Sequence, residues 1–381
     1  MDGKKTQDSG AFDPLGRAGS FMPGKNADFT QEAASSRSRK CPSCGNNLFF
    51  DPATGRLKCA HCGSEQTVFV LPCEKEGLDC LCSTNGAWMR ETHIYHCNNC
   101  NAENVLPRRE IAHVCPFCGS PSVAEKQEFS SVRPNAVLPF AVTREQAASA
   151  AAQWAKKRIF APERFRGYFK PENMKGVYLP AFTFDANTFS SYEGLLGEDT
   201  YTTETDDEGN TTTQCSTDFI PLEGTYEYFL SDLVVHAGEP LPSEVAGDLL
   251  SYDYENSVGY TEEFLYGFSA LLNTRDGQAC WEDAKETARD ILRSEILRQY
   301  RYDTVYRLNV DTQFFDVKYR CLLRPMYIGN YRYRGKSYAF YVNGRNGKTK
   351  GTAPVSPVKA TFAGIGVAVL AALAVFLFCL L

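Results

Sequence analysis

The sequence predicts an α+β protein: two small four-cysteine zinc ribbons, then an antiparallel-sheet domain with flanking helices and a C-terminal transmembrane helix. Three observations lead to this fold class: matched pairs of Cys-x-x-Cys turns, aromatic and β-branched runs between two helical patterns, and a final uncharged apolar run. A length of 381 residues leaves room for two or three folded units, and 43% hydrophobic residues can supply their cores.

The N-terminal segment 1–39 is expected to be disordered, since it is rich in Gly, Ser, Asp and Lys and holds no apolar run of the kind that directs export. The whole chain carries 40 Lys and Arg against 46 Asp and Glu, and a net charge of -6 disfavours binding driven mainly by nucleic-acid phosphates. The 15 cysteines are odd in number and clustered, which favours metal binding over a disulfide framework.

The cysteines of segment 40–122 form two sets with the same internal spacing. Each set has two Cys-x-x-Cys pairs separated by fourteen residues, and every cysteine of the second set lies 56 positions after its counterpart. Two residues between cysteines let one tight turn aim both sulfurs at a single ion, and two such turns complete a tetrahedron of thiolates. We therefore predict two zinc ions, one in a ribbon over 40–70 and one in a linker and ribbon over 71–122. The predicted ligands are Cys41, Cys44, Cys59 and Cys62 for the first ion and Cys97, Cys100, Cys115 and Cys118 for the second.

Between the two turns of the first set, segment 49–58 has the pattern strand, turn, strand. So short a hairpin cannot bury a core of its own, so the metal is expected to supply most of the ribbon's folding free energy. Structural zinc contributes about 10 to 16 kcal/mol in small zinc-finger peptides.

The cysteines allow three other interpretations. Iron stays open, because paired Cys-x-x-Cys turns also hold iron in rubredoxin-type sites. Thiol redox chemistry is disfavoured, because it uses a single such motif near a βαβ unit. A third metal site is open at Cys73, Cys80 and Cys82 with His93 and His96, although their spacing matches no known zinc knuckle.

Segment 123–355 is expected to form the α+β domain. A helix should begin at Thr143, where Gln146 completes a capping box, and a second amphipathic helix should run from Trp281 to about Tyr300. The expected strands and turns are 177–184, 226–230, the hairpin 326–342 around Arg334 and Gly335, and an acidic turn at 206–210.

Positive and negative residues are segregated along this domain, and their distribution predicts contact with a membrane. No Lys or Arg occurs from 176 to 274, whereas 298–359 holds thirteen of them against three Asp. Segment 360–381 is predicted to be a transmembrane helix, because its last twenty residues are uncharged and would extend about 30 Å. The cations before it predict a single-pass cell-membrane protein whose bulk is cytoplasmic and whose basic segment faces the lipid. The alternative is that folding intermixes the charges.

No catalytic constellation is apparent. Segments 329–337 and 344–349 resemble phosphate-binding loops but have the wrong glycine spacing, and five histidines leave little material for acid–base chemistry. The sequence therefore predicts a protein that is not an enzyme, with no small-molecule substrate.

Six short motifs occur along the chain: Cys-Pro-Ser-Cys-Gly at 41–45, Phe-Asp-Pro-Ala-Thr-Gly at 50–55, Cys-Pro-Phe-Cys-Gly at 115–119, Val-Leu-Pro-Phe at 137–140, Gly-Val-Tyr-Leu-Pro at 176–180 and Tyr-Val-Asn-Gly at 341–344. Together they resemble bacterial membrane-anchored zinc-ribbon proteins, which are TFIIB-type zinc ribbon-containing and often mislabelled as PriA helicase-like.

The resemblance implies a non-catalytic membrane-anchored adaptor that presents two cytoplasmic zinc ribbons, projecting from its surface, to a protein partner. It also implies stomatin-like or phage-shock-type partners, in envelope-stress or membrane-organising complexes at the lipid bilayer. The alternative is a nucleic-acid-binding zinc-ribbon protein tethered to the membrane. Segment 40–120 disfavours it, because seven Lys and Arg face eight Asp and Glu there.

Overall fold

The computed structural model describes residues 40–82, 92–98, 103–107, 115, 123–126, 132–205, 211–238 and 247–380. The segment 1–39, expected to be disordered, and the acidic turn expected at 206–210 lie outside these residues.

The first ribbon forms a three-stranded antiparallel sheet of its own, composed of β1 (Leu48–Asp51), β2 (Arg56–Cys59) and β3 (Glu65–Thr67). The predicted strand, turn, strand is confirmed, since β1 and β2 pair in register between Leu48 and Cys59. In the turn, the Asp51 carboxylate accepts hydrogen bonds from the Ala53 N–H at 3.0 Å and the Thr54 hydroxyl at 3.2 Å. The side chain of Asp51 therefore closes the hairpin locally.

A second, mainly antiparallel sheet collects twelve of the described strands. Its main path runs β11, β8, β13, β9, β12, β6, β5 and β7, while β10 pairs with β9, β4 and β14 pair with β13, and β15 pairs with β14. The bounds are β4 Glu76–Gly77, β5 Thr92–Cys97, β6 Glu103–Pro107, β7 Val123–Lys126, β8 Ala136–Val137, β9 Lys175–Thr205, β10 Thr211–His236, β11 Val258–Gly259, β12 Ser269–Leu271, β13 Thr304–Tyr333, β14 Lys336–Asn343 and β15 Thr349–Gly351.

The strands around the second cysteine set belong to this large sheet. β5 pairs with β6 and β7, and β6 pairs with β12 through Val105 and Ala270. The predicted fold class is therefore wrong in describing two separate small ribbons ahead of the sheet domain, because the backbone hydrogen bonds of β6 continue into that sheet.

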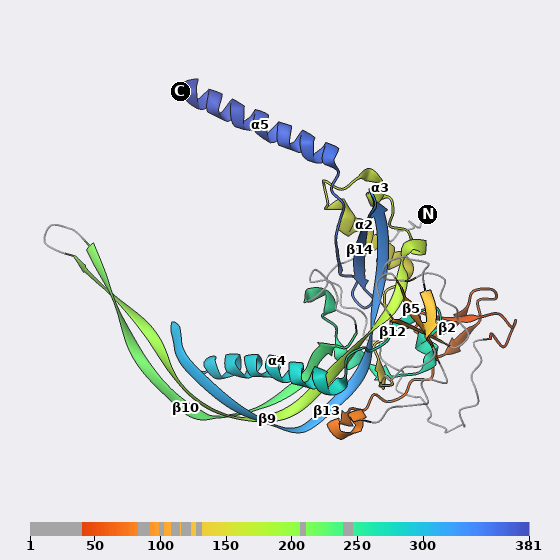
Figure 1. The fold of residues 1–381 in the computed structure, drawn as a ribbon, viewed down its shortest axis with the longest axis horizontal. Coiled ribbons are helices and arrows are strands. Elements are labelled where there is room, and N and C mark those ends of the chain that lie inside the picture. The colour runs from red at the N-terminus through yellow and green to blue at the C-terminus, as the bar shows by residue number, and fades with distance from the viewer. Residues whose placement is uncertain are drawn as a thin grey trace, which may run out of the picture.

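Three strands extend far beyond the rest and form a curved arm (Figure 1). β9 lies between β10 and β13 and pairs with both along most of its 31 residues. Beyond Ala186 the arm is about 60 Å long, at about 3.3 Å per residue. Bulges interrupt both outer strands at one level, where Asp232 (φ 50°) and Asp316 (φ 49°) adopt left-handed conformations. Paired bulges bend and twist a sheet, which explains where the arm departs from the body.

The helices cover the sheet as their apolar patterns require. The capping box at α2 (Arg144–Lys156) is confirmed, with the Gln146 N–H donating to the Thr143 hydroxyl and the Gln146 side chain accepting from the Thr143 N–H. The second predicted helix is α4 (Gly277–Leu297), which lies along the inner side of the arm (Figure 1). Its Trp281 ring packs on Phe184 and Phe314, at centroid distances of 5.2 and 5.4 Å. The remaining helices are α3 Glu163–Arg166 and α5 Pro357–Leu380, with 3-10 turns at Leu78–Cys82, Pro171–Asn173, Asp248–Leu250, Tyr254–Asn256 and Glu262–Leu265.

The hairpin predicted at 326–342 is confirmed by β13 and β14, which pair up to Tyr333 and Lys336. Its two turn residues, Arg334 (φ 50°) and Gly335 (φ 78°), are both left-handed. This is the twist that two-residue hairpins require, and glycine adopts it without strain.

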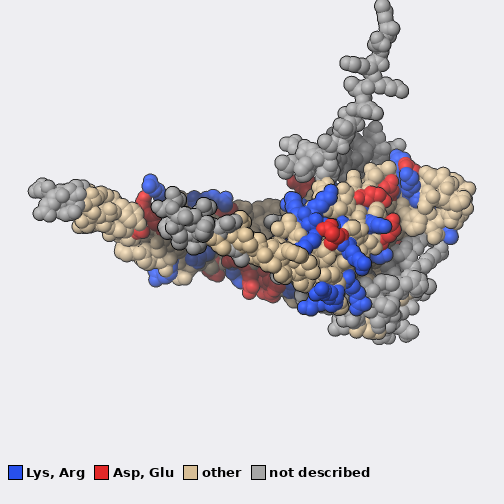
Figure 2. Space-filling model, turned by 90° about the horizontal axis from the view of Figure 1, so that it is seen from above, with Lys and Arg blue, Asp and Glu red and all other residues tan. Residues whose placement is uncertain are grey.

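The divided charges mix in space. Arg320 of β13, only 6% exposed, forms an ion pair with Asp232 of β10, and Lys75 bridges Asp232 and Asp185. Figure 2 shows Lys and Arg side chains beside carboxylates over the body, seen from above. The pairing of β9, β10 and β13 therefore brings cations of one segment against carboxylates of the other near the base of the arm.

The transmembrane helix predicted over 360–381 is wrong. A bilayer span requires about 20 consecutive apolar residues, and among the described residues no helix combines sufficient length with sufficient apolar character. The tail anchor and the single-pass cell-membrane location, which were inferred from that helix, are withdrawn with it.

Candidate metal centre

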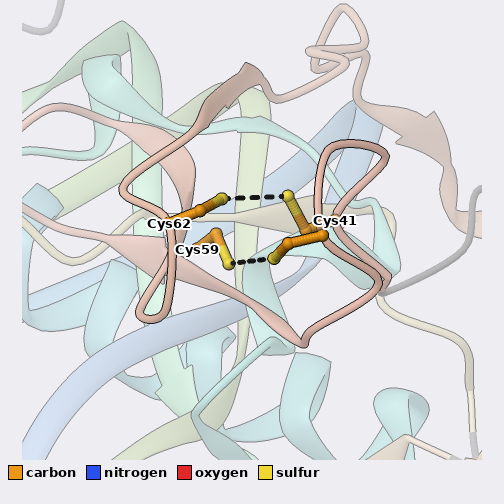
Figure 3. Close-up of side chains that lie close together, drawn as sticks. Cys41, Cys59 and Cys62 are labelled. Atoms are coloured by element: carbon orange, nitrogen blue, oxygen red, sulfur yellow. Dashed lines mark hydrogen bonds between the residues drawn. The ribbon is translucent and has the colours of Figure 1, made fainter.

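The first cysteine set is brought together as predicted. The sulfur atoms of Cys41, Cys44, Cys59 and Cys62 all lie within 4.8 Å of one another. The Sγ–Sγ distance is 3.5 Å both between Cys41 and Cys62 and between Cys44 and Cys59. Figure 3 shows the sulfurs converging from two loops, one before β1 and one after β2. One cluster of four cysteines can therefore hold a metal ion.

The two loops have the same local structure. In the first, the Gly45 N–H donates to the Cys41 carbonyl at 2.8 Å; in the second, the Gly63 N–H donates to the Cys59 carbonyl at 2.9 Å. Both glycines have φ of 73°, a left-handed conformation that a side chain would strain. Glycine after each second cysteine thus lets the chain turn so that both sulfurs point to one side.

Burial divides the four sulfurs into two kinds. Cys41 and Cys59 are 2% and 1% exposed and belong to the main hydrophobic core, whereas Cys44 and Cys62 are exposed. An ion held by all four would link the surface turns to the core.

The surroundings shift the pKa values of Cys41 and Cys44 in opposite directions. Burial opposes ionisation of Cys41, but hydrogen bonds from the Ser43 and Cys44 backbone and from neighbouring thiols lower the pKa of Cys41 to about 6. A backbone hydrogen bond from Asn46 favours the Cys44 thiolate, yet burial and the neighbouring sulfurs together raise the pKa of Cys44 to about 12. Negative charge therefore gathers on one sulfur at the expense of another. A divalent cation relieves this conflict, because it favours the thiolate form of every ligand.

Four sulfur donors select the class of metal. Thiolates at tetrahedral positions suit zinc and iron and do not suit magnesium or calcium, which prefer oxygen.

The second cysteine set is described only in part. Cys97 at the end of β5 and Cys115 are both buried, at 0% and 1% exposure, while Cys100 and Cys118 lie outside the described residues. The second predicted ion remains a prediction.

The third site left open at Cys73 and Cys80 receives no support. Within the described ranges only the first cysteine set forms a candidate metal cluster. Cys73 instead lies 3.8 Å from the Arg320 guanidinium, and Cys80 is exposed. His96 faces Glu103 across β5 and β6 at 3.6 Å, and the side chains of Cys82 and His93 lie outside the described residues.

The ribbon is seated on the body, contrary to the expectation that it projects from the surface. The Phe50 ring, 3% exposed, contacts Phe264 and Phe268 at centroid distances of 5.3 and 6.4 Å. The Phe50 N–H donates to the Tyr266 carbonyl at 3.0 Å, and the Phe69 N–H donates to the Glu263 carboxylate at 2.9 Å. This packing follows from the alternation of side chains along β1, because Leu48 and Phe50 point inward while Phe49 points outward and is 42% exposed.

A hollow of about 390 Å³ lies where the ribbon meets α2. The ribbon contributes Phe49, Pro52 and Lys58, and the body contributes Arg144, Phe268 and Tyr327 among others. Arg144 is held there by donating to the Gly267 carbonyl at 2.8 Å and by lying over the Phe268 ring. Sequence reasoning missed this hollow, because its two walls come from segments more than 80 residues apart; an outward aromatic beside the cysteine turns was the only signal.

One curated relative is similar along most of the chain. The Uncharacterized protein YdjG of Bacillus subtilis (strain 168) is 26% identical over 338 residues, which cover 86% of this chain and 94% of the relative. No protein-family model matches the chain. No solved structure matches it either. The function is therefore inferred from the metal centre and from the packing of the ribbon against the body.

Proposed function

We propose that this chain is a non-catalytic zinc-binding adaptor in which Cys41, Cys44, Cys59 and Cys62 hold a structural zinc ion. The observation that carries the proposal is the convergence of four sulfurs within 4.8 Å of one another. A four-thiolate site leaves no open coordination position for a substrate, so the ion serves structure.

The zinc would fix one wall of a protein-binding hollow. Phe49 and Lys58 lie on the strands between the two cysteine turns, and the hollow they line with Arg144 combines an exposed aromatic ring with two cations and the carboxylates of Asp51 and Glu145. Aromatic and arginine side chains are enriched where proteins bind one another. The resemblance to zinc-ribbon proteins supports the same reading, with the ribbon acting while packed on the body.

Metal analysis tests the first step. Elemental analysis of the purified full chain should show one zinc equivalent fewer in Cys44→Ser than in wild type, and no loss in Cys215→Ser, a matched change at an exposed cysteine of β10. Visible absorption distinguishes the two candidate metals, since zinc is colourless and ferric thiolate is coloured. Equal metal content in wild type and Cys44→Ser would remove the proposal.

Capture of partners tests the adaptor step. Chemical cross-linking in cells should yield a partner protein with wild type and Cys215→Ser, but not with Cys44→Ser or Lys58→Glu. A partner retained by both Cys44→Ser and Lys58→Glu would show that the hollow is not its binding site. A salt-dependent shift of labelled DNA by the full chain, lost in Lys58→Glu, would replace the adaptor with a nucleic-acid-binding role.

A further inference from the structure

The arm presents an uncovered sheet face. Alternate side chains of β9 at 188, 190 and 192 are buried, and Phe314, which pairs with Thr188, packs on Trp281 of α4. The intervening positions 187–193 and their partners in β10 and β13 point to the other side and are exposed. Figure 1 shows α4 along the inner side of the arm and no other described element along the outer side.

An aromatic hollow lies near the base of this outer face. Asn187 pairs with Phe229 on one side and with Phe315 on the other, so both rings flank it on the same face. With Phe189 they line a hollow of about 460 Å³. Phe229 is 56% exposed, Phe315 is 46% exposed and Phe189 is 37% exposed. Exposed aromatic side chains gathered in this way mark a contact surface.

An acidic hollow lies next along the same face. Ser191, Gly224 and Thr225 are small, and around them Glu193, Glu223 and Asp311 line a hollow of about 470 Å³. Glu227, which pairs with Phe189, lines the aromatic hollow and adds a carboxylate there. No Lys or Arg occurs at 187–193, 223–229 or 309–315, so the carboxylates of this face have no cation among these strand segments.

The two hollows are about four residues apart along β9, which corresponds to about 13 Å in a strand. An extended peptide places side chains i and i+4 on one face at the same separation. β10 has an open edge within the described part of the sheet, where it pairs only with β9. An extended segment can therefore lie along the face or add to this edge.

We propose that the outer face of the arm binds an extended cationic polypeptide segment, with its Lys or Arg side chains in the acidic hollow and aromatic or aliphatic side chains in the aromatic hollow. Charge selects this occupant over a second copy of the chain, which would bring Glu193, Glu223 and Asp311 against the same carboxylates. It also selects against nucleic acid, whose phosphates the carboxylates repel. This surface is separate from the metal centre and does not depend on the zinc proposal.

Titration calorimetry with a defined peptide tests the proposal on the full chain. The probe is the heptapeptide Lys-Thr-Lys-Thr-Phe-Thr-Phe, blocked at both ends, and the control peptide has Glu in place of both Lys. Wild type should bind the probe at low salt, lose affinity as salt rises, and bind the control peptide at least about tenfold more weakly.

Two variants and one matched control locate the binding. Glu223→Lys with Asp311→Lys, and separately Phe189→Ser, should each weaken probe binding about tenfold or more. Glu286→Lys, the same charge reversal on the exposed side of α4, should leave it unchanged. Circular dichroism checks that every variant is folded. The proposal is overturned if the probe does not bind wild type, or if it binds the double variant Glu223→Lys with Asp311→Lys as tightly as it binds wild type. It is also overturned if Phe189→Ser abolishes self-association of the protein, which would make the face a dimer interface.

Discussion

Replacing Phe50 with alanine should separate the ribbon from the body and show how far the metal stabilises the whole fold. Phe50 is 3% exposed and packs on Phe264 and Phe268, so its removal leaves a cavity at the junction. Truncations of buried phenylalanine destabilise by about 3 to 5 kcal/mol. Urea unfolding followed by circular dichroism of the sheet should therefore show a loss of this size, with the slope of the transition little changed.

The neighbouring residue supplies the control. Phe49→Ala removes the same ring from the same strand, but Phe49 is 42% exposed, so the loss should be about 1 kcal/mol or less. Chelation of the metal should destabilise the body in wild type and do so markedly less in Phe50→Ala, because the contact that transmits the effect is already gone. Equal losses from Phe49→Ala and Phe50→Ala, or an unchanged effect of chelation in Phe50→Ala, would refute the view that the ribbon stabilises the body through Phe50.

Three further changes have defined outcomes. Arg320→Ala should destabilise the protein by about 1.5 to 3 kcal/mol in urea unfolding, because it removes a buried guanidinium from the Asp232 carboxylate, which keeps only Lys75; Arg301→Ala, which breaks the exposed pair with Glu198, should cost under about 1 kcal/mol, and equal losses would contradict this. Gly335→Val should lower stability by about 1 to 2 kcal/mol in the same assay, because valine at φ 78° is strained, and no change would show that the turn relaxes. Bound zinc, measured with a chromogenic chelator, should be retained at pH 7 and released progressively on acidification, because protons compete with the ion for the four thiolates; complete release at pH 7 would contradict a four-thiolate site.

Local signals in the sequence were enough for local structure. The capping box at Thr143 and the turn at Arg334 and Gly335 depend on a few neighbouring residues, and both are present as predicted. The convergence of the first four cysteines was predictable for the same reason, since each Cys-x-x-Cys-Gly turn is set by its own backbone.

Long-range pairing was not predictable from these signals. Between 187 and 193 the exposed positions of β9 hold Asn, Phe, Ser and Glu, and the buried positions hold Thr, Ser and Tyr. Polarity does not distinguish the two faces, so the extent of β9 depends on the strands beside it. Asp232 and Asp316 adopt the left-handed conformation that aspartate tolerates, but a single Asp within a run of apolar residues does not predict a bulge. The seat of the ribbon on Phe264 and Phe268 likewise joins segments about 200 residues apart.

The metal ligands can be measured directly by zinc K-edge absorption on the full chain carrying Cys100→Ser and Cys118→Ser, which removes the second predicted set and leaves the first. We expect one zinc ion with four sulfur neighbours at about 2.3 Å, which Cys44→Ser in the same background removes. A sample without stoichiometric metal, or an ion surrounded mainly by oxygen or nitrogen, would contradict a zinc-stabilised ribbon seated on the body.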